Sequence, residues 1–280
     1  MSATTEVKGF PQYAGTRYRV SFGGLVRSEW IKFWSVRSVV VTMVAAVVAI
    51  VGLGVLISWG TASTLANPEI GPQMAAQGVD ATAISLQGAQ MATLIVAAVG
   101  VIVIAGEFST GMVRTTFVTA PGRLGAFAAK ALVLAVSVAV LSAVAVLLAF
   151  LAGQALLDRE GVGASLSDDG VLRALAGNVA MLVGVALAGL GVGALLRNTA
   201  GAISTVLAAI FVVPLLLMLV PESWGGDTIR EYWFSNAVMN ATAVTEQPQY
   251  LDVVPGLGVF AAWVVVLLGL GALSLKSRDV

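Results

Sequence analysis

The sequence contains no cysteine and no histidine. The lack of cysteine excludes disulfides and thiol chemistry, and the two absences together exclude zinc sites of the usual kind and catalysis by an imidazole. Charged residues are also scarce, at 11% of the 280 residues, where a soluble domain of this length carries about a quarter. Because 58% of the residues are hydrophobic, water is not the main solvent of this chain.

Long apolar runs are what the sequence has in abundance. Six segments contain about 20 residues without a charge, the length at which a helix crosses a hydrocarbon core of about 30 Å. They are 39–59, 88–106, 131–153, 174–196, 200–220 and 256–275. A backbone in lipid must satisfy its own hydrogen bonds, and the alternating pattern of barrel strands is missing. The sequence therefore predicts an all-α membrane protein with six transmembrane helices, and it disfavours the alternative, buried helices of a large soluble protein.

Lysine and arginine are unevenly divided between the two sides that six spans define. Twelve of the 15 lie in the terminal segments and in the loops after the second and fourth spans, and only Arg159, Arg173 and Arg230 lie in the opposite loops. Cytoplasmic loops carry the excess of basic residues, so both termini are expected in the cytoplasm. We expect residues 1–20 to be a disordered cytoplasmic tail and 21–280 to be a single transmembrane domain of the cytoplasmic (inner) membrane.

The apolar runs contain no ionisable residue, and the few polar side chains within them, such as Gln90 and Asn178, are neutral. Ion-coupled carriers and charge-selective channels place charges inside the membrane, so their mechanisms are not expected here. Intramembrane enzymes need paired acids, a metal or a nucleophile with its base, so no catalytic or metal site is predicted. No G-x-x-x-x-G-K-S/T loop is present, and energy for uphill transport would have to enter from another protein.

Two features of the spans concern helix geometry. Gly189 and Gly193 lie four residues apart on one face of the fourth span, where they allow close approach of another helix of this chain or of a dimer partner. Pro214 in the fifth span lacks a backbone donor and predicts a kink.

The long loop 221–255 contains apolar residues at helical spacing. They are Ile229, Tyr232, Trp233, Ala237, Ala241 and Val244. The pattern predicts a short amphipathic helix at the outer membrane surface, which is either an interfacial anchor or a substrate gate.

Aromatic and basic residues are mixed in the segment before the first span. Its apolar residues, three or four positions apart, are Phe22, Val26, Trp30, Phe33 and Trp34. Arg27, Lys32 and Arg37 lie among them. The pattern predicts a helix along the inner leaflet, with aromatic rings at headgroup depth and cations on anionic lipid. A simple interfacial anchor is the alternative to a role in coupling.

The loop after the second span begins at Glu107. Ser109 and Thr110 can cap a short helix, and Arg114 would remain in water. The apolar face of that helix would consist of Met112, Val113, Thr116 and Phe117. A helix of this kind suits docking into a groove of a partner. In the alternative reading, Glu107 and Arg114 are solvated charges that only fix the topology.

This loop resembles the first cytoplasmic loop of bacterial type-2 ATP-binding cassette permeases. In that family a Glu ends the second span, a Ser/Thr-Gly follows, and a Pro and a basic residue lead to a Lys at the start of the third. The corresponding residues are Glu107, Thr110, Gly111, Pro121, Arg123 and Lys130. The order of elements along the whole chain is also similar. The resemblance implies that the loop is the coupling helix, with Met112, Arg114 and Phe117 in its docking region, and that the N-terminal helix is an elbow helix.

The resemblance further implies a permease subunit that exports an amphipathic or hydrophobic substrate. Two ATPase subunits would bind ATP and magnesium, while this chain would hold no cofactor and have no enzymatic activity. A second permease chain, identical or similar, and membrane lipid are the other expected partners, and nucleic acid is not. A non-transporting scaffold or immunity-type binding protein is the main alternative; a passive facilitator is disfavoured by the apolar interior.

Overall fold

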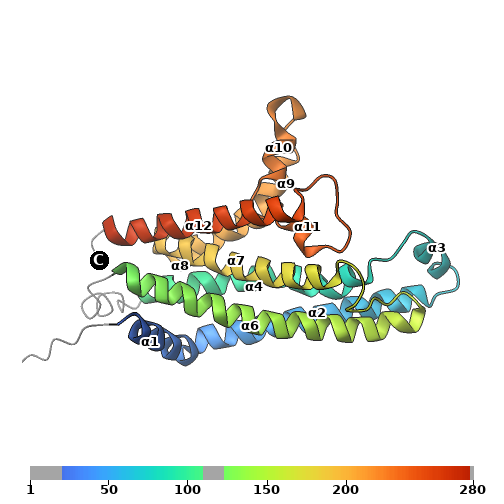
Figure 1. The fold of residues 1–280 in the computed structure, drawn as a ribbon, viewed down its shortest axis with the longest axis horizontal. Coiled ribbons are helices and arrows are strands. Elements are labelled where there is room, and N and C mark those ends of the chain that lie inside the picture. Colours follow the sequence, from blue (N-terminus) through green and yellow to red (C-terminus); the bar gives the residue numbers. More distant parts are fainter. Residues whose placement is uncertain (1–20, 110–122, 278–280) are drawn as a thin grey trace, which may run out of the picture.

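A computed structural model describes residues 21–109 and 123–277, and within these ranges all regular secondary structure is helical (Figure 1). Six helical segments are long and apolar enough to cross a membrane, which confirms the predicted fold class and number of spans. They are α2 (Arg37–Leu65), α4 (Ala81–Ser109), α6 (Arg123–Leu157), α7 (Val171–Leu196), the segment Thr199–Leu217 and α12 (Val253–Ser277). Short helices include α1 (Phe22–Ser35) and α3 (Gly71–Ala76).

Most helices extend beyond the apolar runs that predict them. For example, α4 has 29 residues and α6 has 35. The extra turns contain polar groups that are not part of a hydrocarbon-spanning stretch, such as Glu107 near the end of α4 and Gln154 in α6. A charge-free run measures the hydrocarbon thickness, whereas a helix continues until its capping residues end it.

Different helices and connections lie at the two ends of the bundle. Helix α1 and the last residues of α4 and α12 lie together at one end, which we call the terminal end (Figure 1). Helix α3 and the connection between α6 and α7 lie at the other, the opposite end (Figure 1). This arrangement is the one that an even number of spans requires.

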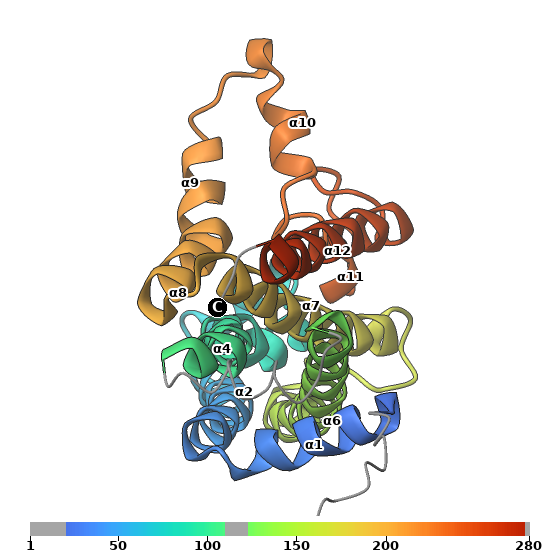
Figure 2. The same cartoon turned by 90° about the vertical axis from the view of Figure 1, so that its left-hand side faces the viewer.

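Helices α4 and α7 form the middle of the bundle. Seen end-on, α2 and α6 lie on one side of this pair and α12 and the fifth span on the other (Figure 2). In their most apolar stretches 56% of the residues of α4 and 67% of those of α7 are buried, against 39% or less in the other four spans. Most side chains of the outer helices therefore remain available to lipid.

Glycines bring the backbones of α4 and α7 into contact. A Cβ atom added at Gly189 would lie 2.5 Å from the carbonyl oxygen of Ala97, and one added at Gly100 would overlap the carbonyl oxygen of Ala186. Gly193 also faces α4. In this chain the glycine pair of the fourth span thus packs against the second span of the same molecule.

The fifth span is interrupted in its second half. Helix α8 (Thr199–Leu207) passes into a π-helical segment, Ala208–Val212, and then into α9 (Val213–Leu217), where Pro214 occupies the first turn. Together with α10 (Gly226–Glu231), α9 projects sideways from the bundle (Figures 1 and 2). A π-helical turn directly before a proline is a common way for a helix to change direction.

The single amphipathic helix expected between Ile229 and Val244 is not formed, so that prediction was wrong. The segment contains two short helices, α10 and α11 (Met239–Thr242), separated by turns. The side-chain amide of Asn236 donates to the carbonyl oxygen of Arg230 at 2.9 Å, a local bond that competes with helix continuation. Ala241 is buried against α7 at Gly177, so the segment folds back onto the bundle.

Replacement of Gly100 by Ala is expected to destabilise the protein by about 1–3 kcal/mol, because the new methyl group would overlap the backbone of α7. The matched control is Gly52→Ala, where no atom lies within 4 Å and the loss of a helical glycine is neutral or favourable. Thermal unfolding in detergent, followed by size-exclusion chromatography, measures both. Equal unfolding temperatures for the two variants would contradict the proposed backbone contact.

Candidate functional site

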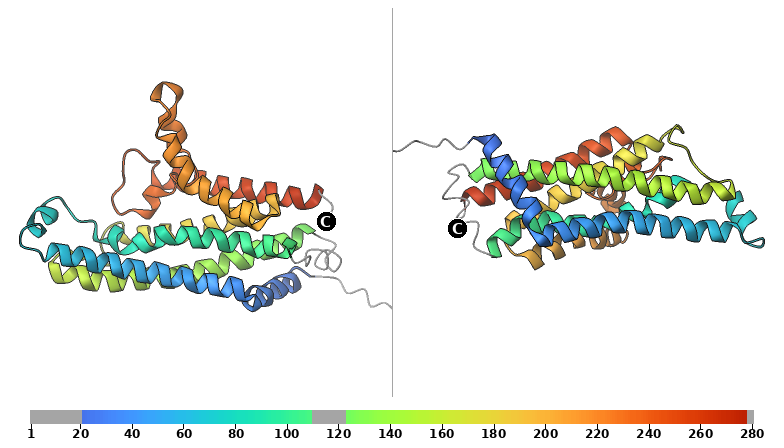
Figure 3. Two further views of the ribbon diagram at one scale, coloured as in Figure 1. Left: turned by 180° about the vertical axis from the view of Figure 1, so that it is seen from behind. Right: turned by 90° about the horizontal axis from the view of Figure 1, so that it is seen from below.

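Helix α1 is a separate helix that crosses the terminal end of the bundle (Figures 2 and 3). Its first turn is capped by Ser21, whose hydroxyl oxygen accepts the N–H of Gly24 at 3.1 Å. Its last turn is followed by Val36, whose extended backbone separates α1 from α2 by a single residue. A hinge this short fixes where α1 can lie, so the contacts of its buried face decide how it docks.

The residues predicted for the N-terminal helix lie on two different faces. Phe33 is buried against the bundle and Val26 is half-buried, whereas Phe22, Trp30 and Trp34 are exposed. The rings of Trp30 and Trp34 lie next to each other in a tilted arrangement, with centroids 6.0 Å apart and planes at 56°. The aromatic residues are therefore divided between the core and the outward face of α1.

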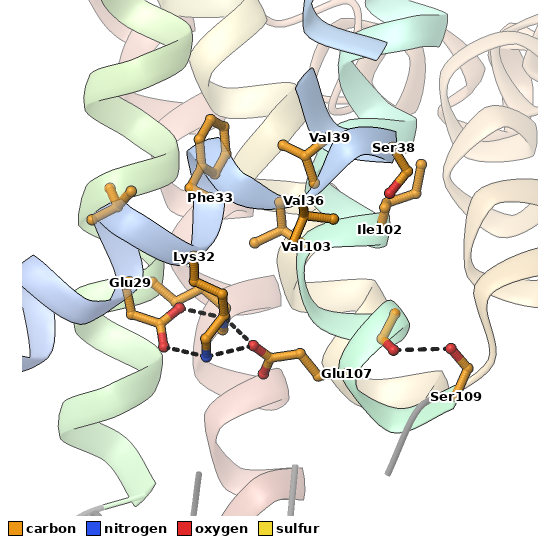
Figure 4. A pocket seen from close by; sticks show the side chains of 13 residues that line it. Glu29, Lys32, Phe33, Val36, Ser38, Val39, Ile102, Val103, Glu107 and Ser109 are labelled. Atoms are coloured by element: carbon orange, nitrogen blue, oxygen red, sulfur yellow. Dashed lines mark hydrogen bonds and ion pairs between the residues drawn. The ribbon is translucent and has the colours of Figure 1, made fainter. Parts of the chain in front are cut away.

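Four charged side chains meet beneath α1, and we call them the charge quartet (Figure 4). They are Glu29, Lys32, Glu107 and Lys130. The Lys32 ammonium donates to Glu29 Oε1 at 2.8 Å and to Glu107 Oε1 at 2.7 Å. The Lys130 ammonium donates to Glu29 Oε2 at 2.5 Å and to Glu107 Oε1 at 2.9 Å. Each lysine bridges both carboxylates, so the quartet is a closed ring that joins α1, α4 and α6.

The quartet is shielded from water. The side chains of Glu29 and Lys130 are each 5% exposed, that of Glu107 is 8% exposed, and only Lys32 reaches 24%. Two acids and two lysines make the set electrically neutral. Removing one member would leave an uncompensated buried charge, which typically costs about 3–5 kcal/mol.

The two members on α1 have pKa values that reflect this pairing. Burial alone raises the pKa of Glu29, but the charge and hydrogen bond of Lys130, aided by Lys32, hold it below its ordinary value of 4.5. Burial alone lowers the pKa of Lys32, but its hydrogen bonds with Glu107 and Glu29 hold it above 10.5. Both groups are therefore charged at neutral pH.

A cavity of about 270 Å³ lies beside the quartet, between α1, α2, α4 and α6 (Figure 4). Its walls are mainly aliphatic. The residues that supply them include Val36, Val39, Ile102, Val103 and Val133. These side chains surround the ion pairs with apolar groups and so strengthen the electrostatic attraction among them.

A second contact ties the end of α4 to the other half of the bundle. The guanidinium of Arg197 lies 5.1 Å from the centroid of the Phe108 ring and donates to the carbonyl oxygen of Ser274 at 3.0 Å. Arg197 ends α7 in the left-handed conformation, with φ of 54°. The end of α4 is thus connected to α7 and α12 as well as to α1 and α6.

The structure brings together Glu107 and Lys130, which the loop motif contains, and Lys32 of the N-terminal segment. The remaining predicted loop residues, Thr110, Gly111, Met112, Arg114, Phe117 and Pro121, lie outside the described residues. Arg123 is the first residue of α6, and its side chain also lies outside what the structure describes.

Glu29 was not predicted as a site residue, although the sequence contains a signal for it. It lies three residues after Val26 and four before Phe33, on the stripe that α1 buries. A carboxylate on the apolar stripe of an amphipathic helix needs a buried cation, and Lys32 is the (i, i+3) neighbour that supplies one.

The closed ring predicts non-additive effects of substitution. Glu107→Gln leaves a surplus positive charge and is expected to lower the unfolding free energy by about 3–5 kcal/mol. Adding Lys130→Met restores neutrality through the remaining Glu29–Lys32 pair, so the double variant should be more stable than the sum of the single losses predicts. Chemical unfolding of the three variants in detergent measures this. Strictly additive losses would mean that the four groups do not interact as a unit.

The quartet also predicts how α1 responds to pH. Glu29 has a lowered pKa, so its contribution is present above 4.5 and is lost as the pH falls through its folded-state pKa. Lys32 has a raised pKa, so its contribution is present below 10.5 and is lost as the pH rises through its folded-state pKa. With spin labels at cysteines replacing Ser28 of α1 and Leu132 of α6, the distance between the two labels should stay constant from about pH 6 to about pH 9. An increase in this distance near neutral pH, as α1 moves away from α6, would contradict this assignment.

Comparison of the chain with protein-family models and with curated proteins gave no match. The charge quartet, the cavity beside it and the six spans are therefore the features of this chain that bear on its function.

Proposed function

We propose that this chain is the membrane-spanning permease subunit of an ATP-driven exporter, energised by a separate cytoplasmic ATPase. The observation that carries the proposal is the charge quartet, which fastens α1, α4 and α6 together two residues before the described part of α4 ends at Ser109. An element pushed by a partner at the loop 110–122 would move three helices as one body. The loop resembles the coupling segment of type-2 ATP-binding cassette permeases.

The distribution of charge supports a cytoplasmic position of the terminal end. Twelve of the 15 basic residues lie in the terminal segments and in the loops after the second and fourth spans, which are on the same side as the termini. A cytoplasmic ATPase would then meet the quartet side of the bundle. In this orientation α1 is the elbow helix, and its outward Trp30 and Trp34 lie at the depth of the lipid headgroups.

The remaining parts of the proposal follow from the resemblance and from the composition. One six-helix chain supplies half of a pathway, so the working unit would be a dimer of permease chains with two ATPase copies. ATP and magnesium would bind to the ATPase, because this sequence has no phosphate loop. The substrate would be amphipathic or hydrophobic, in keeping with spans that contain few polar groups.

The test is co-purification with an ATPase encoded beside the gene of this chain. The parent should retain the ATPase and confer hydrolysis that depends on both proteins. Met112→Asp and Phe117→Asp place a charge on the proposed docking face and are expected to reduce the retained ATPase about tenfold, which corresponds to about 1.4 kcal/mol.

The control is Ser167→Asp, in an exposed loop at the opposite end, which should retain the ATPase like the parent. Because the chain lacks cysteine, Ser109→Cys and Ser167→Cys can also report orientation with a thiol reagent that does not cross membranes. In intact cells only the cysteine at 167 should react. An ATPase retained equally by every variant, or labelling at 109, would leave the non-transporting scaffold as the better explanation.

A further inference from the structure

A second cavity, of about 460 Å³, lies where α9 leaves the bundle. Its walls come from α4, α7, the π-helical segment 208–212 and the residues around α11, and Phe260 of α12 also lines it. The point at which α9 turns away is visible in Figure 1. None of the charge quartet lines this cavity, so the two sites are separate.

The lining of this cavity is uncharged. Among the described residues around it there is no Asp, Glu, Lys or Arg. The apolar side chains include Met91, Met181, Phe211 and Phe234. Methionine and phenylalanine adapt to apolar groups of varied shape, and the cavity volume lies in the range of small-molecule sites. A charged ligand would find no counter-ion here, and burying its charge would be costly.

The polar side chains that line the cavity differ in how many of their hydrogen bonds are made within the protein. The side-chain amide of Asn178 is fully used as a donor, to the carbonyl oxygens of Ala174 at 2.8 Å and Thr242 at 3.1 Å. The amide nitrogen of Gln90 makes only long contacts, 3.5 Å to Asn178 Oδ1 and 3.4 Å to Thr242 Oγ1. These distances exceed the usual range of a good hydrogen bond, so Gln90 retains most of its hydrogen-bonding capacity.

Gln87 lies one turn before Gln90 on the same helix and lines the same cavity. Within the described part of the chain its side-chain amide has no hydrogen-bond partner. The Gln87 side chain is only partly buried, so its amide can bond to a molecule in the cavity. Two under-occupied amides, three residues apart in a helix that is otherwise apolar, are what a hydrogen-bonding ligand would satisfy. The π-helical segment also lines this cavity, and π-helical turns recur at functional sites.

We infer that this cavity binds an uncharged amphiphile, whose hydroxyl or amide group bonds to Gln87 and Gln90 while its apolar part lies on Met91 and Phe211. The inference deepens the proposed function, because it takes this ligand to be the class of molecule that the exporter carries. Binding itself requires neither the ATPase nor a second chain.

The test uses the purified chain in lipid nanodiscs without ATPase and a diazirine-bearing octanol as the probe. After illumination, mass spectrometry should find saturable labelling of peptides that contain Met91, Met181 or Phe211. The corresponding octylammonium probe, which differs by its charge, should label these peptides at least about tenfold less. Gln90→Met, similar in size but without the amide, should raise the half-saturating octanol concentration about 3–10-fold.

The matched control is Gln73→Met, an exposed position in α3 outside the cavity, which should bind like the parent. If Gln90→Met fails to fold, Gln87→Met and competition of the parent by unlabelled octanol answer the same question. Unsaturable labelling spread over lipid-facing residues such as Val44 and Val265 would overturn the inference, as would equal labelling by the ammonium probe. Absence of cavity labelling leaves ATPase association intact, and failure of ATPase association leaves the labelling intact, so the two proposals fail separately.

Discussion

The contact between α4 and α7 is the constraint on which both sites depend. Inside a membrane an apolar helix gains nothing by exchanging lipid for another apolar helix, so association relies on close packing and polar contacts. Glycines at 100 and 189 supply the close packing by letting each backbone touch the other. Helix α4 carries Glu107 near its terminal end and Gln87 and Gln90 toward its opposite end. Its place between α7 and the outer helices therefore positions both the quartet and the uncharged cavity.

The quartet is better understood as a device for geometry than for net stability. Desolvating four ionised groups costs much of what their attraction returns, and apolar replacements of buried ion pairs are often as stable. The ring fixes the register of α1 on the bundle, because Glu29 is bonded to Lys130 of α6 and Lys32 is bonded to Glu107 of α4. An apolar docking face would let α1 slide along the bundle, whereas these bonds accept one register. A helix joined to α2 through the single residue Val36 needs such a register to keep a defined angle.

The sequence was sufficient for the fold class because charge-free runs report the thickness of the hydrocarbon, and the membrane imposes helices on them. It was insufficient for the quartet because its bonds are long-range: Lys32 and Glu107 are 75 residues apart, and Glu29 and Lys130 are 101 apart. The positions of Lys32, Glu107 and Lys130 in the sequence predict that they lie near one side of the membrane, but not that they meet. The wrong prediction of one helix over Ile229–Val244 has a local cause instead. The apolar residues do recur at helical spacing, but the side chain of Asn236 bonds to the nearby backbone and interrupts the helix.

The distance between the two sites bears on how they would work together in the proposed exporter. Gln90 and Glu107 are separated by about 25 Å of one uninterrupted helix, which can carry a displacement but cannot by itself provide two alternative states. The element with a built-in break is the fifth span, where a π-helical segment and Pro214 border the cavity. A displacement of α4 relative to that break would change the cavity while the quartet stayed intact. In the proposed exporter, gating would therefore depend on residues 208–214, and α4 would transmit the displacement from the quartet to the cavity, so that the two roles would fall to different helices.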